Sequence, residues 1–174
     1  MYTVDDRDRV VEWDLPPQSS PGSPVPELVS SEFDLALAYY LDDLDTERYG
    51  KPQDVHGAEN DDLVAVLRFD LGPYAFFFGP PNDEAFSGHP LEPRGLGPYG
   101  TYEVVESSWI RALERMNSVH HQHDTEGFLD GLHHFVVSFH DSTFECVARS
   151  EPSVHVYRGT VRAAMLDALQ SFRD

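Results

Sequence analysis

The stretch HFVVSFHDSTFECVAR, residues 134–149, carries the strongest structural signal in the chain. Apolar and polar residues largely alternate in two runs on either side of a polar dipeptide at 141–142, which is typical of a β-hairpin with a short turn. Because successive side chains of a strand point to opposite faces, one face of the hairpin is predicted to be core and the other polar. The polar face is expected to carry His134, Ser138, His140, Glu145 and Arg149.

The length of the turn decides which polar side chains meet on this hairpin. A two-residue turn places His140 opposite Thr143 and Ser138 opposite Glu145, so His140 and Glu145 become diagonal neighbours. A histidine beside a carboxylate is a usual combination for proton transfer, with Asp141 as a group that orients the ring. The alternative is a solvated sheet face whose side chains only form surface hydrogen bonds.

Further strands are predicted outward from the hairpin by alternating or continuous apolar runs. The first run, 33–41, repeats its apolar residues at period two, although its Ala and Leu content also favours a helix. The other predicted strands cover 63–69, 74–78 and 99–105, with an edge strand at 154–157.

Two amphipathic helices complete the predicted fold. Ser107 or Ser108 can cap the first helix and Thr160 the second, with room for a short helical turn after Thr125. Their apolar faces are formed by Trp109, Ile110, Leu113 and Met116, and by Val161, Met165, Leu169 and Phe172. Together, the predicted strands and helices indicate an α+β fold, a mostly antiparallel sheet with two amphipathic helices packed on one face.

The chain of 174 residues fits one domain preceded by an arm. Prolines at 16, 17, 21, 24 and 26 remove backbone donors and exclude a helix, so residues 1–31 are expected to form an extended Pro/Ser-rich arm. Trp13 is a candidate anchor for this arm. Residues 32–174 are expected to form a single α+β domain.

Composition restricts the classes of partner. The net charge of −19 disfavours direct binding to nucleic acid or to an anionic lipid surface. No stretch approaches the roughly 20 apolar residues that a membrane helix needs, and the acidic start does not resemble a signal peptide. A single cysteine, Cys146, fits a reducing compartment, and a cytoplasmic location is predicted. Its place on the apolar face of the hairpin predicts an inert thiol.

The segment 79–91 is a second candidate for a functional element, because it combines rigid turns with acids and a histidine. It could present Glu84 and His89 to a substrate from a fixed backbone. Equally, Asn82 or Asp83 could cap a helical turn while His89 satisfies buried carbonyl groups.

Seven of the nine histidines lie between residues 89 and 140, which raises the possibility of a divalent transition metal. The candidate ligands are His89, His120, His123 and His140. Their spacing matches neither a zinc-protease helix nor a zinc finger, and a polar loop whose histidines cap and bridge is the other interpretation.

Four segments resemble a family of small uncharacterised bacterial proteins: PNDEAFSGHPL at 81–91, Ser108-Trp109, MNSVH at 116–120 and FHDSTFEC at 139–146. The resemblance covers about residues 33–149 and leaves out the Pro-rich arm. It implies that these segments belong to one unit, and it implies no activity, cofactor or catalytic residue.

Two classes of function follow. The first is a small-molecule-binding protein or enzyme with a pocket between the 79–91 loop and the polar face of the hairpin. There, Glu84 or Glu145 would act as acid or base, and His89 and His140 would carry protons or bind metal. The second is a non-enzymatic acidic module, an inhibitor or immunity-type protein that binds a basic protein partner, for example through the carboxylates of 42–62. The sequence predicts neither a substrate nor an oligomeric state.

Overall fold

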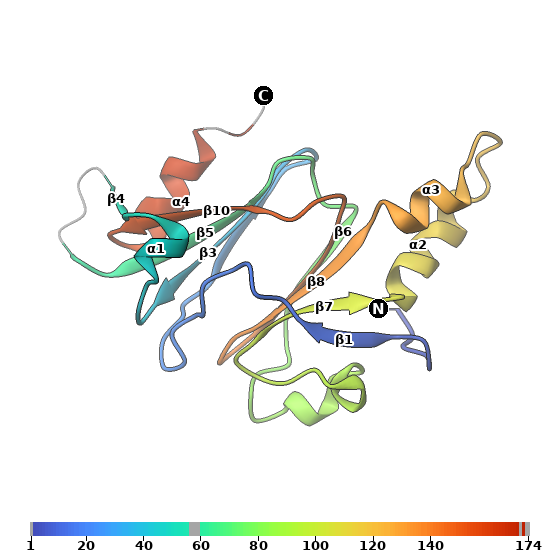
Figure 1. Cartoon of the computed structure of the whole chain (residues 1–174), viewed down its shortest axis with the longest axis horizontal. Helices are drawn as coiled ribbons and strands as arrows, with labels where there is room; N and C mark the ends of the chain where they lie inside the picture. Colours follow the sequence, from blue (N-terminus) through green and yellow to red (C-terminus); the bar gives the residue numbers. More distant parts are fainter. Residues whose placement is uncertain (1, 56–59, 171, 173–174) are drawn as a thin grey trace. The chain divides into compact units, whose positions relative to one another are not determined.

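The structure is a computed structural model and describes residues 2–55, 60–170 and 172. Its strands and helices group into two compact units (Figure 1). The first unit contains the residues up to Trp13 together with Tyr74–Ser150, and the second contains Asp14–Pro73 and the residues from Glu151 onward. In the described residues, each unit holds one five-stranded sheet.

The first unit is built on an antiparallel sheet with the strand order β1-β7-β8-β9-β6. The strands are β1 (Arg9–Glu12), β6 (Ala75–Gly79), β7 (Thr101–Val105), β8 (His133–Ser138) and β9 (Thr143–Ala148). The hairpin of β8 and β9 is central, because β7 pairs with the outer edge of β8 and β6 with that of β9. This position explains the dense apolar content of the hairpin, since both of its faces are covered.

Two helices lie on the first unit and pack against each other (Figure 1). Helix α2 (Ser108–Asn117) follows β7 directly, and the Oγ of Ser107 caps it by accepting the N–H groups of Trp109 and Ile110. Helix α3 (Thr125–Asp130) is capped by Asp124. Ile110 and Phe128 from these helices bury Val147 of β9, which closes one end of the hairpin face.

The segment between β6 and β7 covers the other end of the same face. It contains two short 3₁₀ helices, η1 (Phe86–Gly88) and η2 (Glu92–Arg94). Phe86, Leu91 and Leu96 pack against Val136 of β8. The polar residues that lie between the two apolar clusters are therefore excluded from water.

The second unit has the strand order β2-β3-β5-β10-β4. Its strands are β2 (Glu27–Ser30), β3 (Leu35–Leu41), β4 (Gln53–Asp54), β5 (Leu63–Phe69) and β10 (Ser153–Arg158), and a short helix α1 (Thr46–Tyr49) precedes β4. The pairs are antiparallel apart from the parallel contact of β10 with β4. Of the acidic segment 42–62, residues 56–59 lie outside the described residues.

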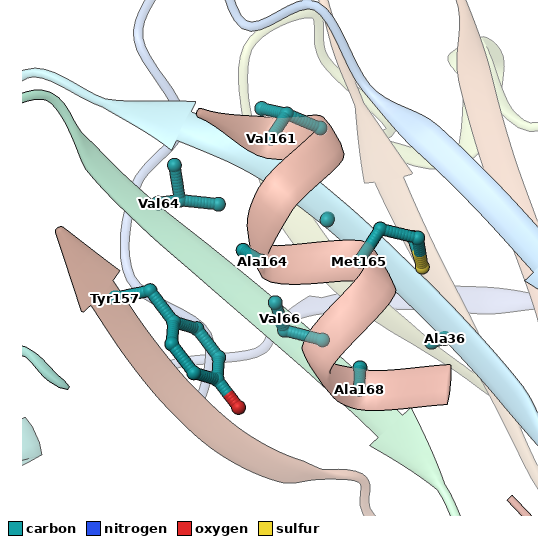
Figure 2. Packing of buried hydrophobic residues seen from close by; sticks show 9 residues of the cluster. Ala36, Val64, Val66, Tyr157, Val161, Ala164, Met165 and Ala168 are labelled. Carbon is teal, nitrogen blue, oxygen red and sulfur yellow. The ribbon is translucent and has the colours of Figure 1, made fainter. Parts of the chain in front are cut away.

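Helix α4 (Val161–Leu169) supplies the core of the second unit (Figure 2). Thr160 caps it by accepting the N–H of Ala163 at 3.1 Å. Val161, Ala164, Met165 and Ala168 of α4 lie over Ala36, Val64, Val66 and Tyr157 of the sheet. The small alanines let the helix approach the strands closely, so Met165 is fully buried.

The predicted α+β class with mostly antiparallel pairing is confirmed, although the strands form two sheets and each sheet carries its own helix or helices. The strand interpretation of 33–41 is correct, because β3 forms there. The predicted edge strand at 154–157 is instead internal, since β10 has β5 on one side and β4 on the other.

The segment expected to be an arm contributes strands to both sheets. β1 pairs with β7, and β2 pairs with β3. The pairing of β1 with β7 agrees with an extended conformation of the chain near Trp13. The ring of Trp13 stacks on that of Phe135, with ring centroids 4.4 Å apart. The boundaries of an arm over 1–31 and a single domain over 32–174 stay a prediction.

Within the described residues, no helix has the length and apolar character needed to cross a membrane.

Candidate functional site

A buried carboxylate lies at the centre of the first unit. Glu145 on β9 is 2% exposed, and three side chains from different segments surround its carboxylate. The Oε2 atom accepts the hydroxyl of Tyr2 and also lies 3.1 Å from Nε2 of His134 on β8. The Oε1 atom lies 3.5 Å from Nε2 of His89, just after η1. We call these four residues the Glu145 cluster.

The tautomer of His134 follows from its second ring nitrogen. Nδ1 lies 2.9 Å from Oγ of Ser107, and that oxygen already accepts two backbone N–H groups as the cap of α2. A hydroxyl has one proton and two lone pairs, so Ser107 donates its proton to Nδ1 of His134. The ring proton of His134 is therefore on Nε2, where it is donated to Glu145.

His89 is held in the same tautomer by the backbone. The N–H of Leu91 is donated to Nδ1 of His89 at 3.2 Å, so this nitrogen carries no proton. The neutral ring then bears its proton on Nε2, facing Glu145. Phe86 stacks on the His89 ring with centroids 5.7 Å apart, which keeps the ring in place.

These three donors decide the charge of the carboxylate. Burial alone would raise the pKa of Glu145, because it disfavours the charged form. The hydrogen bonds from His134 and His89, the electrostatic attraction of the His134 ring and the hydrogen bond from Tyr2 outweigh that effect and lower the pKa to about 2. The same burial, together with the adjacent carboxylate, raises the pKa of Tyr2, so its hydroxyl keeps its proton. Glu145 is consequently an ionised group held by three hydrogen-bond donors.

The N-terminal segment brings Tyr2 to the cluster and is itself anchored at the start of α2. Asp8 is buried and accepts the N–H of Ser108 at 2.6 Å, and Arg111 pairs with Asp5 at 2.6 Å. The Tyr2 ring stacks on Trp109 with centroids 5.1 Å apart and an interplanar angle of 10°. A carboxylate at a helix N-terminus is favourable, because the free N–H groups there carry partial positive charge.

A pocket of about 370 Å³ opens beside the cluster, and we call it the Glu145 pocket. Phe77 of β6 lies directly opposite Glu145 in the strand register. The lining residues are Tyr2, Phe76, Phe77, Trp109, Ala112, Leu113, Met116 and Glu145. Among these described residues, Glu145 is the one charged side chain, and the rest present apolar or aromatic surface.

The predicted register of the hairpin is wrong by two residues. Ser138 pairs with Thr143, and Val136 pairs with Glu145, because the turn spans four residues, 139–142, instead of two. A shift of two preserves the faces, so the polar set stays together. The diagonal partner of Glu145 is therefore His134 and not His140.

The polar face is also buried, contrary to the expectation that it would be the polar side of the sheet. His134 and Ser138 are fully buried and Glu145 almost so, whereas the side chain of His140 is 40% exposed. The apolar clusters at the two ends of this face explain the difference. The alternative of a solvated sheet face is thus wrong for Glu145.

The remaining sequence candidates lie in a separate, exposed group. Nδ1 of His140 lies 3.1 Å from Oδ1 of Asp141, and this contact, with the nearby acids Asp83 and Glu84, raises the pKa of His140. Asp83 accepts the hydroxyl of Tyr99, and this bond lowers the pKa of Asp83. The structure therefore brings His89 to Glu145, and His140 to Asp141, but it does not bring the two pairs into one set of contacts.

The histidines of 120–123 form local contacts. Nε2 of His123 lies 3.1 Å from Glu114, and Nδ1 of His120 accepts the N–H of Gln122 at 3.2 Å. Across the described parts of the chain, no group of three or more His, Cys, Asp or Glu side chains has an arrangement that could hold a metal ion. In the Glu145 cluster, the two Nε2 atoms carry protons and so act as donors. Cys146 is buried, and burial raises the pKa of its thiol.

Sequence reasoning missed Tyr2, His134 as the partner of Glu145, and the apolar lining of the pocket, Trp109 included. The alternation of the hairpin placed His134 on the correct face, and a four-residue turn would have paired it with Glu145. Trp109 was assigned only to the helix core. Tyr2 had no local signal, since its bond to Glu145 joins residues 143 positions apart.

Comparisons with protein-family models, with curated proteins and with solved structures find no match.

Proposed function

We propose that this chain binds a small, largely apolar molecule in the Glu145 pocket, with a hydrogen-bond donor of the ligand directed at the carboxylate. The observation that carries this proposal is an ionised, buried carboxylate in the wall of an otherwise apolar pocket. Ligand sites commonly combine an apolar lining with a few fixed polar groups that orient the ligand.

The size of the pocket suits this role. A volume of about 370 Å³ lies within the roughly 300–1,000 Å³ of typical small-molecule sites. Trp109 and Phe77 offer flat faces, while Leu113 and Met116 offer flexible aliphatic surface from α2. Met116 is 71% exposed, which is the arrangement expected for an apolar side chain that a ligand covers.

The carboxylate is positioned before any ligand arrives. Its donors come from the N-terminal segment, the loop after η1 and strand β8, and each of the two rings is fixed by a second hydrogen bond. A carboxylate has roughly four lone-pair positions, of which the contacts from the described residues use three. A site held in this way binds without the cost of ordering its own groups.

The proposal assigns Glu145 to recognition. With a pKa of about 2 it stays ionised at neutral pH and is a weak base, whereas a general acid or base works best with a pKa near the working pH. We therefore propose that His89 and His134 hold the carboxylate and do not transfer protons.

The test is a binding screen with a blocked pocket as control. Trp109 lines the pocket, so quenching or enhancement of tryptophan fluorescence reports ligands from a library of small apolar amines, alcohols and amides. Ala112→Phe places a ring in the pocket, and Arg115→Phe places the same ring at an exposed position of α2 outside the lining. Hits that bind wild type and Arg115→Phe but not Ala112→Phe support the proposal. Hits that bind all three proteins equally, or no hits, contradict it.

A further inference from the structure

We infer that the ligand of the Glu145 pocket is an organic cation, an alkylammonium group attached to an apolar or aromatic body. This inference rests on the proposed function and adds the charge of the ligand. It depends on the charge of the Glu145 cluster, on the aromatic surfaces of the pocket lining and on the negative net charge of the whole chain.

The negative charge of the cluster is not neutralised by its own donors. His89 accepts the N–H of Leu91 and His134 accepts the hydroxyl of Ser107, so both rings are neutral and bear a single proton on Nε2. Tyr2 is a neutral donor as well. In the part of the chain that the structure describes, no Lys or Arg pairs with the Glu145 carboxylate, which favours a cation at the open side of the cluster.

The lining supplies surfaces that attract a cation and none that repel it. No Lys or Arg belongs to the described lining of the pocket. Tyr2 and Trp109 are stacked in parallel, and Phe77 of β6, which pairs with Glu145 in the sheet, also lines the pocket. The face of an aromatic ring is electron-rich, and binding of ammonium groups by several such faces is a recurrent mode of recognition.

The geometry also provides a specific contact for an ammonium group. In the proposed complex, one N–H of the ammonium is directed at the carboxylate of Glu145, while the carbon chain lies on Leu113 and Met116. The net charge of −19 raises the concentration of cations near the surface and lowers that of anions. A carboxylate ligand of the same shape would meet repulsion from both sources.

Three probes of one shape test the inference: phenylpropylammonium, phenylpropanol and phenylbutyrate, which carry a positive, neutral and negative end group. Affinities are measured by calorimetry and by tryptophan fluorescence at pH 7. We expect the ammonium to bind at least about tenfold more tightly than the alcohol, and the carboxylate more weakly than both. Ala112→Phe should reduce binding of the ammonium and the alcohol alike.

Glu145→Gln identifies the source of the preference. It should reduce the ratio of ammonium to alcohol affinity to about one. If this variant does not fold, the ratios among the three probes in the wild type decide the question. An alcohol that binds as tightly as the ammonium overturns the inference and leaves the proposed function intact. A preference that survives in folded Glu145→Gln also overturns it, and a failure of all three probes contradicts the proposed function itself.

Discussion

Replacing Glu145 by Gln should destabilise the first unit by about 3 kcal/mol at pH 7, and the size of that effect should depend on pH. The carboxyl has an ordinary pKa of 4.5 and a folded-state pKa of about 2. At about 1.4 kcal/mol per pKa unit, this difference corresponds to about 3 kcal/mol of stability from the ionised form. An amide keeps the size of the side chain but turns an N–H group toward one of the three donors, which leaves a buried donor without an acceptor.

The sign of the pH dependence follows from the lowered pKa. The contribution of Glu145 is complete above pH 4.5, where the unfolded chain is also ionised, and it is lost as the pH falls toward 2. The difference in the free energy of unfolding between wild type and Glu145→Gln should therefore decrease to about 1 kcal/mol at pH 3. Urea unfolding followed by tryptophan fluorescence measures this gap, because both tryptophans, Trp13 and Trp109, lie in the first unit.

The chain contains a matched control for this variant. Glu103 lies 2.7 Å from Nδ1 of His133 in the same sheet, but both side chains are partly exposed. Glu103→Gln should lower the free energy of unfolding by less than about 1 kcal/mol, as is usual for solvent-accessible ion pairs. The reasoning is refuted if the two variants lose equal stability at pH 7, or if the gap for Glu145→Gln stays constant down to pH 3.

Three further predictions concern the supports of the site and the second core. Tyr2→Phe keeps the aromatic ring but removes a donor, so the pKa of Glu145 should rise and urea unfolding at pH 7 should show a loss of about 1 kcal/mol. Ser107→Ala removes both the cap of α2 and the hydrogen bond to His134, and its loss in the same assay should reach about 2–3 kcal/mol. In α4, Met165→Ala should lower the free energy of unfolding by about 2–5 kcal/mol, and Leu166→Ala, at the exposed neighbouring position, by less than about 0.5 kcal/mol. Unfolding followed by circular dichroism measures both losses, and equal losses would contradict the packing in Figure 2.

Local patterns of the sequence predicted much of the secondary structure. The alternation of β8 and β9 determined which side chains share a face, because that property has a period of two and survives a register shift of two residues. The caps at Ser107 and Thr160 were predicted from the residue types that accept helix N–H groups. These features depend on neighbours in the chain, so the sequence alone is sufficient for them.

The features that depend on distant segments could not be predicted. The pairing of β5 with β10 joins residues more than eighty positions apart, so the division of the strands into two sheets had no local signal. The turn of the hairpin decides whether His134 or His140 meets Glu145, and two-residue and four-residue turns are both compatible with FHDS at 139–142.

The burial of Glu145 also has a long-range origin. It results from α2, α3 and the segment with η1 and η2 covering the ends of one sheet face. Nothing in the hairpin itself distinguishes this arrangement from a solvated face. For the same reason, the ionised carboxylate could be named as a candidate from the sequence, but its low pKa could not.

The most direct measurement of the central claim is an NMR titration of the two tryptophan indole N–H signals with phenylpropylammonium. Trp109 lines the Glu145 pocket, whereas Trp13 is buried against Phe135 and is not part of the lining, so it serves as an internal control. We predict a saturable shift of the Trp109 signal with the Trp13 signal unchanged, and loss of that shift in Ala112→Phe. A Trp109 signal that stays fixed, or that moves in parallel with Trp13 without saturating, would contradict a ligand site at Glu145.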